Sequence, residues 1–212
     1  MRTLVIETAT AACSVALIDD GAVIAAAHEV VGRGHAERLL PMIAELPDGG
    51  RARRILVDCG PGSFTGVRVG IAAARGLALG WNATAFGFSS MSLVAATGFA
   101  SNPDWQALAV ILEGGHGEVF MQAFDAPSLA PAADLVSLKP EAALAALGGR
   151  PAIGNGVRWL TGLNSSLTAI EALPRAADAI LLPPGSTDLP PRPIYGRAPD
   201  AKPLVAASRP QP

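Results

Sequence analysis

Residues 59–70 read CGPGSFTGVRVG and stand between two segments of different character. The stretch before them, RRILVDCG at residues 53–60, is rich in aliphatic and β-branched residues and predicts a strand. The stretch after them predicts a helix that continues to about Gly80. A glycine-rich turn of this kind either holds an anion at the helix N-terminus or lets the helix pack very close to its neighbours.

The anion interpretation starts from the backbone. Gly60, Gly62 and Gly66 would let N–H groups approach a phosphate, and Ser63 and Thr65 would add hydroxyl groups. The spacing matches neither G-x-x-x-x-G-K-[ST] nor G-x-G-x-x-G, and no lysine follows the glycines. The motif alone therefore does not specify a nucleotide site.

The packing interpretation starts from the helix. Glycine inside a helix costs about 1 kcal/mol relative to alanine, so repeated glycines indicate a close approach by another element. We predict that this helix packs tightly on its own sheet and presents Arg68 and Arg75 to a partner; an ordinary amphipathic helix with solvated arginines is the alternative. The small residues form two rows with a spacing of four: Gly66, Gly70 and Ala74, and Ala72, Gly76 and Gly80.

Composition excludes several classes of protein. The 212 residues are 50% hydrophobic, and 16 Lys and Arg residues stand against 18 Asp and Glu residues. A basic RNA-binding face is therefore not expected, and the one basic cluster, RARR at residues 51–54, is expected to be a solvated loop. Cys13 and Cys59 lie in apolar strand-like runs, which fits a reducing cytosol. The N-terminal run predicts a strand and not a signal peptide, and no apolar run is long enough for a membrane span.

The order of predicted elements indicates an α/β fold in two lobes. Asp20-Gly21 between two apolar runs predicts a hairpin, and the helix around Pro41 is expected to start late or to kink. A second hairpin is predicted around residues 114–117, then a strand near Leu135 and a helix at about 140–147. Both halves begin with a hairpin, as in a duplicated fold. The expected division is residues 1–100, residues 101–182, and a proline-rich extended tail at 183–212.

No catalytic or metal-binding residues are predicted. The three histidines, His28, His35 and His116, include no H-x-x-x-H pair, and two isolated cysteines do not make a zinc site. The sequence PGSFTG also lacks the second glycine of a G-x-S-x-G nucleophile turn.

Six stretches follow one another along the chain: VIETATAACSVAL, GHAERLLPMI, GPGSFTGVRVGIAAARGLALG, GEVFMQAF, IGNG and PIYGRAPDAKP. Taken together and in this order, they resemble the TsaB (YeaZ) family. The resemblance implies the two-lobed fold of actin, Hsp70 and sugar kinases. It also implies a non-catalytic, cytoplasmic partner of TsaD, the subunit that transfers a threonylcarbamoyl group onto adenosine beside the anticodon of tRNAs reading ANN codons. TsaE would act on the assembled pair, tRNA would be contacted only indirectly, and any nucleotide would sit at a subunit junction.

In this family, the helices that match residues 36–46 and 66–80 form the heterodimer face and can also self-associate. The resemblance therefore implies a partner face at Leu39, Leu40, Ile43, Arg68, Ala72, Arg75 and Leu79. It also leaves a candidate vestigial phosphate loop at Glu7, Thr8, Gly60, Gly62, Ser63, Thr65 and Gly66. Glu7 departs from the aspartate that is usual in the family, and Glu113 lies in a second departure, LEGGHGEVF.

Two alternatives stay open at this point. One is a small actin-fold kinase or ATPase that holds a magnesium nucleotide near Glu7, Thr8, Ser63 and Thr65. The other is a free-standing homodimer with a binding role of its own.

Overall fold

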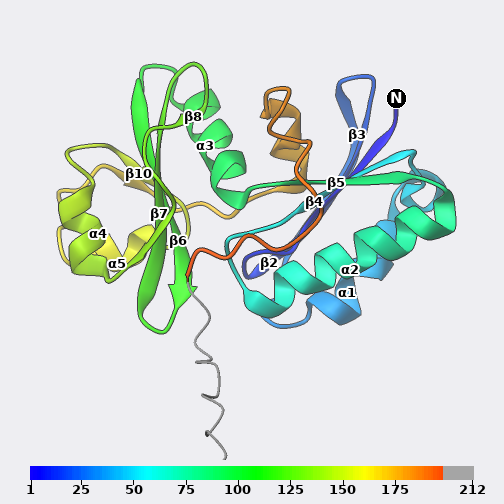
Figure 1. The fold of residues 1–212 in the computed structure, drawn as a ribbon, viewed down its shortest axis with the longest axis horizontal. Helices are drawn as coiled ribbons and strands as arrows, with labels where there is room; N and C mark the ends of the chain where they lie inside the picture. Colours follow the sequence, from blue (N-terminus) through cyan, green and yellow to red (C-terminus); the bar gives the residue numbers. More distant parts are fainter. Residues whose placement is uncertain (198–212) are drawn as a thin grey trace, which may run out of the picture.

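The computed structural model describes residues 1–197 (Figure 1). The end of the predicted tail, residues 198–212, lies outside the described residues. The strands are β1 Thr3–Glu7, β2 Ala12–Asp19, β3 Ala22–Val30, β4 Arg54–Asp58, β5 Thr84–Phe88, β6 Ala107–Gly115, β7 Glu118–Asp125, β8 Ala130–Pro131, β9 Val136–Leu138, β10 Ala152–Ile153 and β11 Ala169–Ile170. The helices are α1 His35–Glu45, η1 Pro47–Gly50, α2 Phe64–Trp81, α3 Ser90–Ser101, α4 Pro140–Ala146, α5 Val157–Thr161 and η2 Ala176–Leu181.

The first sheet has the strand order β3-β2-β1-β4-β5. Its first three strands form an antiparallel meander, and β4 and β5 continue parallel to β1. The predicted hairpin is confirmed, with Asp20 at φ 46° and Gly21 at φ 79° in the turn. Both residues adopt the left-handed conformation that a tight turn between twisted strands requires.

The second sheet repeats this plan. Its order is β11-β10-β6-β7-β8, with β9 also paired to β7. The path β9-β7-β6-β10-β11 has the same strand directions as β3-β2-β1-β4-β5, because β6, β7 and β9 are antiparallel and β10 and β11 continue parallel to β6. The second predicted hairpin and the expectation of two mixed sheets with packed helices are confirmed.

One helix lies between the two sheets, and other helices cover their outer faces (Figure 1). α1 and α2 lie together on one face of the first sheet, over a core that includes Leu4, Ile6 and Val57. α3 lies between the sheets and shares one core with both of them, while α4 and α5 cover the outer face of the second sheet. Among residues 1–197, no helix has both the length and the apolarity to cross a membrane.

Helix α1 begins at His35, so the expectation of a late start near Pro41 is wrong. The buried His35 ring explains the early start: its Nε2 atom lies 2.9 Å from the Thr10 carbonyl oxygen and 3.0 Å from that of Ala12. Leu39, Met42 and Ile43 then bury one side of the helix. This packing outweighs the backbone hydrogen bond that Pro41 cannot donate.

Residues 182–197, which we call the C-terminal strap, run back along the first lobe. Leu189 exchanges two backbone hydrogen bonds with Gly87 of β5, and Ile194 N donates to the Cys59 carbonyl oxygen at 2.8 Å. η2, which precedes the strap, contacts β1, β2, β3 and α3 rather than the second sheet's outer helices. The lobe boundaries at residues 100 and 182 remain a proposal, and these contacts group η2 with the first lobe.

Candidate functional site

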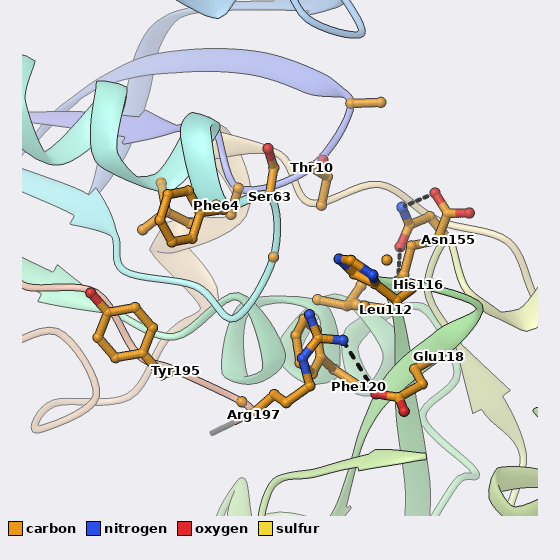
Figure 2. A pocket seen from close by; sticks show the side chains of 18 of the residues that line it. Thr10, Ser63, Phe64, Leu112, His116, Glu118, Phe120, Asn155, Tyr195 and Arg197 are labelled. Carbon is orange, nitrogen blue, oxygen red and sulfur yellow. Dashed lines mark hydrogen bonds and ion pairs between the residues drawn. The ribbon is translucent and has the colours of Figure 1, made fainter. Parts of the chain in front are cut away.

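A cleft of about 850 Å³ opens where the two lobes face each other. On the first-lobe side lie Thr10, from the turn between β1 and β2, and Ser63, at the start of α2 (Figure 2). On the second-lobe side lie His116, from the turn between β6 and β7, and Glu118, the first residue of β7. A large concave pocket with convergent polar groups is the usual place for a ligand, so the cleft is one candidate site. Four aromatic side chains line it: Phe64, Phe120, Trp159 and Tyr195.

The glycine-rich turn packs directly against the turn between β1 and β2. A Cβ atom at Gly62 would lie 2.0 Å from the Ala9 carbonyl oxygen, and one at Gly66 would lie 2.1 Å from that of Thr8. A Cβ atom at Gly70 would lie 2.4 Å from the Thr8 hydroxyl oxygen. These positions accept no side chain, so the glycines serve the close approach of α2 to β1, as the packing interpretation predicts.

Three backbone N–H groups of this turn already have partners. Ser63 N donates to the Ala9 carbonyl oxygen at 2.6 Å, and Gly60 N donates to Asp58 Oδ1 at 2.7 Å. Gly66 N donates to Ser63 Oγ, the N-cap of α2, at 3.2 Å. The β1–β2 turn thus occupies the space beside Gly62 and Gly66 that an anion would need. Of the candidate phosphate-loop residues, Gly62 and Ser63 also line the open cleft.

Two buried carboxylates, Glu7 and Asp58, lie behind the turn at the ends of the adjacent parallel strands β1 and β4. Glu7 Oε1 accepts from Ala9 N at 2.7 Å, and Asp58 Oδ1 accepts from Ser90 Oγ at 2.6 Å. The second oxygen of each carboxylate has no hydrogen-bond partner among the described residues.

The two carboxyl groups favour protonation. Burial, together with the nearby Asp58 carboxylate, raises the pKa of Glu7 well above its ordinary value. Burial raises the pKa of Asp58 to about 7, although hydrogen bonds from Ser90 and Gly60 act in the opposite direction. Asp58 was not predicted from the sequence, but a carboxylate at the end of each of two neighbouring parallel strands was a usable signal. No group of three or more His, Cys, Asp or Glu residues within residues 1–197 could hold a metal ion.

A second polar cluster forms the far wall of the cleft. Glu113 Oε1 accepts from Arg158 and, at 3.1 Å, from Trp159 Nε1. Asn155 Oδ1 accepts from Glu113 N at 3.2 Å (Figure 2). Glu113 was noted in the sequence only as a departure from the family, and Trp159 was not singled out. Trp159 lies in the cleft because it belongs to the short helix α5, which the sequence pattern does not predict clearly.

The two arginines of α2 bind the C-terminal strap. Arg75 Nη2 donates to the Pro191 carbonyl oxygen at 2.6 Å, and Arg68 Nη2 donates to the Tyr195 hydroxyl at 3.0 Å. The Arg68 guanidinium also lies 3.3 Å from the centre of the Phe64 ring. The strap therefore lies beside the exposed side of α2, and the sequence could not show this because the two partners are more than 100 residues apart.

The seven residues predicted at a partner face divide by exposure. Leu39 and Ile43 are only 1% and 2% exposed and belong to the core beneath α1, so we remove them from the proposed face. Leu40 and Leu79 are 52% and 87% exposed. Ala72 and Arg75 are also exposed, although Arg75 donates to the Pro191 carbonyl oxygen. Arg68 hydrogen-bonds within the chain and lines the cleft. Gly76 and Gly80 have no atom within 4 Å of a Cβ position, so the second row of small residues faces outward.

Two lobes built on one mixed-sheet plan, with a cleft between them, define the actin, Hsp70 and sugar-kinase class of α/β proteins. The chain belongs to the family described as "TsaD: tRNA N6-adenosine threonylcarbamoyltransferase", whose sequence model matches residues 26–148, more than half of the chain.

Individual relatives agree with this placement. The "tRNA threonylcarbamoyladenosine biosynthesis protein TsaB" of Escherichia coli is 42% identical over 125 residues, which are 57% of this chain and 53% of that protein. The TsaB protein of Haemophilus influenzae is 37% identical over 113 residues, 51% of this chain and 48% of that protein. The matches thus span about half the length of these curated relatives. The structure of "YeaZ from Pseudomonas aeruginosa" superimposes with a TM-score of 0.77 at 27% identity, over 92% of this chain and 99% of that one.

Proposed function

We propose that this chain is a non-catalytic, cytoplasmic subunit of the assembly that makes threonylcarbamoyladenosine beside the tRNA anticodon. It pairs with and activates the catalytic TsaD subunit, TsaE acts on the assembled pair, and tRNA is held mainly by TsaD. The curated relatives, which are named for this biosynthesis, support the proposal. An older label for such chains, glycoprotease, gains no support from the histidines, since two of the three lie apart on β3 and in the β6–β7 turn.

The observation that carries the proposal is the outer side of α1 and α2. Leu79 is 87% exposed and Leu40 is 52% exposed, on helices whose inner sides are well packed. Beside them, Ala72, Gly76 and Gly80 leave a flat track along α2 that another helix could approach closely. Exposed leucines, small residues and an arginine together are typical of a helix-to-helix interface.

We expect the double substitution Arg75→Glu with Ala72→Trp to abolish pairing with TsaD while the monomer stays folded. Tryptophan would fill the flat track, and glutamate would reverse the charge beside it. Light scattering on size-exclusion fractions measures the pairing, and circular dichroism checks the fold. The matched control is Arg175→Glu with Ile180→Trp, which introduces the same two residues at exposed positions around η2. Normal pairing by the folded Arg75→Glu, Ala72→Trp protein would contradict the assignment of the face.

Nucleotide binding by the isolated chain is the second candidate, and the size of the cleft is the observation that favours it. Calorimetric titration with magnesium ATP tests it, and we expect no saturable binding below about millimolar concentration because the glycine turn offers few free N–H groups. Gly62→Val would not be informative, since any side chain there collides with the Ala9 carbonyl oxygen. His116→Ala is the better variant, because His116 lies in an exposed turn and lines the cleft. Saturable binding that His116→Ala removes would favour the nucleotide protein over the scaffold.

A further inference from the structure

A second, smaller groove lies at the opposite end of the first sheet from the cleft, where α2 ends and β4 begins. Its volume is about 370 Å³. We call it the basic groove, and define it by Arg2, Arg51, Ala52, Arg53, Trp81 and Asn82. Three of its six residues are arginines, in a chain with two more acidic than basic residues.

The strand register brings these arginines together. β1 and β4 are parallel with Thr3 opposite Arg54, so Arg2 and Arg53 stand side by side one position earlier. Ala52 is buried and both of its neighbours, Arg51 and Arg53, are exposed. Arg51 and Arg53 both line the groove.

The groove holds donors without matching acceptors. Arg2 is paired, with its Nη1 atom 2.7 Å from Asp48 Oδ2 and its Nε atom 3.4 Å from Asp19 Oδ2. The side chains of Arg51 and Arg53 make no hydrogen bond or ion pair with residues 1–197, and within that part of the chain neither do the Trp81 indole N–H and the Asn82 amide. Two guanidinium groups that are unpaired within residues 1–197 therefore line one small groove, beside Trp81 and Asn82.

A purely structural role is also available to these arginines. α2 ends at Trp81, and cations near a helix C-terminus stabilise it by about 0.3–1 kcal/mol each. That role needs only charge near the helix end. It does not need two exposed arginines, Arg51 and Arg53, that line one groove and are unpaired within residues 1–197.

We propose that the basic groove binds a phosphate group, and that the phosphate belongs to the backbone of the tRNA held by the assembled complex. A planar guanidinium matches two phosphate oxygens, and Arg51 and Arg53 are placed to make such contacts. The choice of tRNA as the source rests on the proposed function. With a net charge of −2, the chain supplies one local contact to an RNA that its partner grips elsewhere.

The test uses the complex of this chain with TsaD and an unmodified tRNA that reads an ANN codon. We expect Arg51→Ala with Arg53→Ala to weaken tRNA binding about tenfold at low salt, and to reduce the slope of log affinity against log salt by about 1, as for the loss of one phosphate contact. The control, Arg175→Ala with Arg192→Ala, removes two other exposed arginines and should leave both quantities unchanged. Pairing with TsaD is verified for every variant first.

A second arm titrates the isolated chain with inorganic pyrophosphate and records its thermal midpoint. Unchanged tRNA affinity and salt slope would overturn the RNA assignment, even if pyrophosphate binding is lost, because the groove would then serve a free anion. Variants that lower the thermal midpoint without changing either kind of binding would overturn the phosphate site and leave only the helix-end role. If the wild-type chain fails to pair with TsaD, the proposed function fails, and the pyrophosphate arm still tests the groove by itself.

Discussion

Gly66→Ala is expected to lower the free energy of unfolding by about 3 kcal/mol, because its added methyl group would lie 2.1 Å from the Thr8 carbonyl oxygen. The obstacle is backbone and not a flexible side chain, so either β1 or α2 would have to move. The Thr8 hydroxyl donates to the Gly66 carbonyl oxygen at 2.8 Å, and that hydrogen bond would be disturbed as well.

The matched control lies on the same helix. Gly76→Ala adds the same methyl group where no atom lies within 4 Å, so the variant should gain about 0.5–1 kcal/mol from the higher helix propensity of alanine. Urea unfolding of both variants measures the difference. If Gly66→Ala unfolds like Gly76→Ala, the glycine turn does not pack as described, and an anion-binding role for it would have to be considered again.

Asp58→Asn is expected to stabilise the protein at neutral and higher pH by about 2 kcal/mol or more. Burial raises the pKa of Asp58 from its usual 3.8 to about 7, so the folded protein keeps a proton that the unfolded chain has already released. The contribution of this carboxyl is therefore most favourable below pH 4 and is lost as the pH rises toward 7. Each unit of difference corresponds to about 1.4 kcal/mol.

Asparagine keeps the acceptor for Gly60 N and Ser90 Oγ and removes the charge near Glu7. Unfolding of the wild type should therefore show stability that falls between pH 4 and pH 7, and the variant should show a smaller fall. The exposed control, Asp104→Asn, should follow the wild type at every pH. An equal loss of stability in Asp58→Asn at pH 5 and pH 8 would mean that the carboxylate is needed in its charged form.

The fold was largely predictable because its signals are local. Asp20-Gly21 specifies a turn with positive φ at both positions. The spacing of hydrophobic residues also changes from the strand repeat to the helix repeat where strands are followed by helices. The start of α1 was not predictable in the same way. It depends on the buried ring of His35 reaching two carbonyl oxygens of the β1–β2 turn, and such tertiary contacts override the local penalty of Pro41.

The candidate site was predictable only in part. The outward row of small residues on α2 follows from helical spacing. Leu39 and Ile43 recur at helical spacing with Met42 and Leu46, which is typical of a core-facing side, and the structure buries them. The strap, the second wall of the cleft and the basic groove join residues far apart in sequence, such as Arg75 with Pro191. Such juxtapositions exist only after the two sheets have formed.

The most direct test of the central claim is light scattering on size-exclusion fractions of this protein, of TsaD from the same genome, and of a mixture of the two. The proposed scaffold predicts a mixed species heavier than either protein alone, which the Arg75→Glu, Ala72→Trp protein fails to form. Independent elution of the two wild-type proteins, with and without nucleotide, would contradict the proposed function. The family relationship would then describe the fold of this chain but not its role.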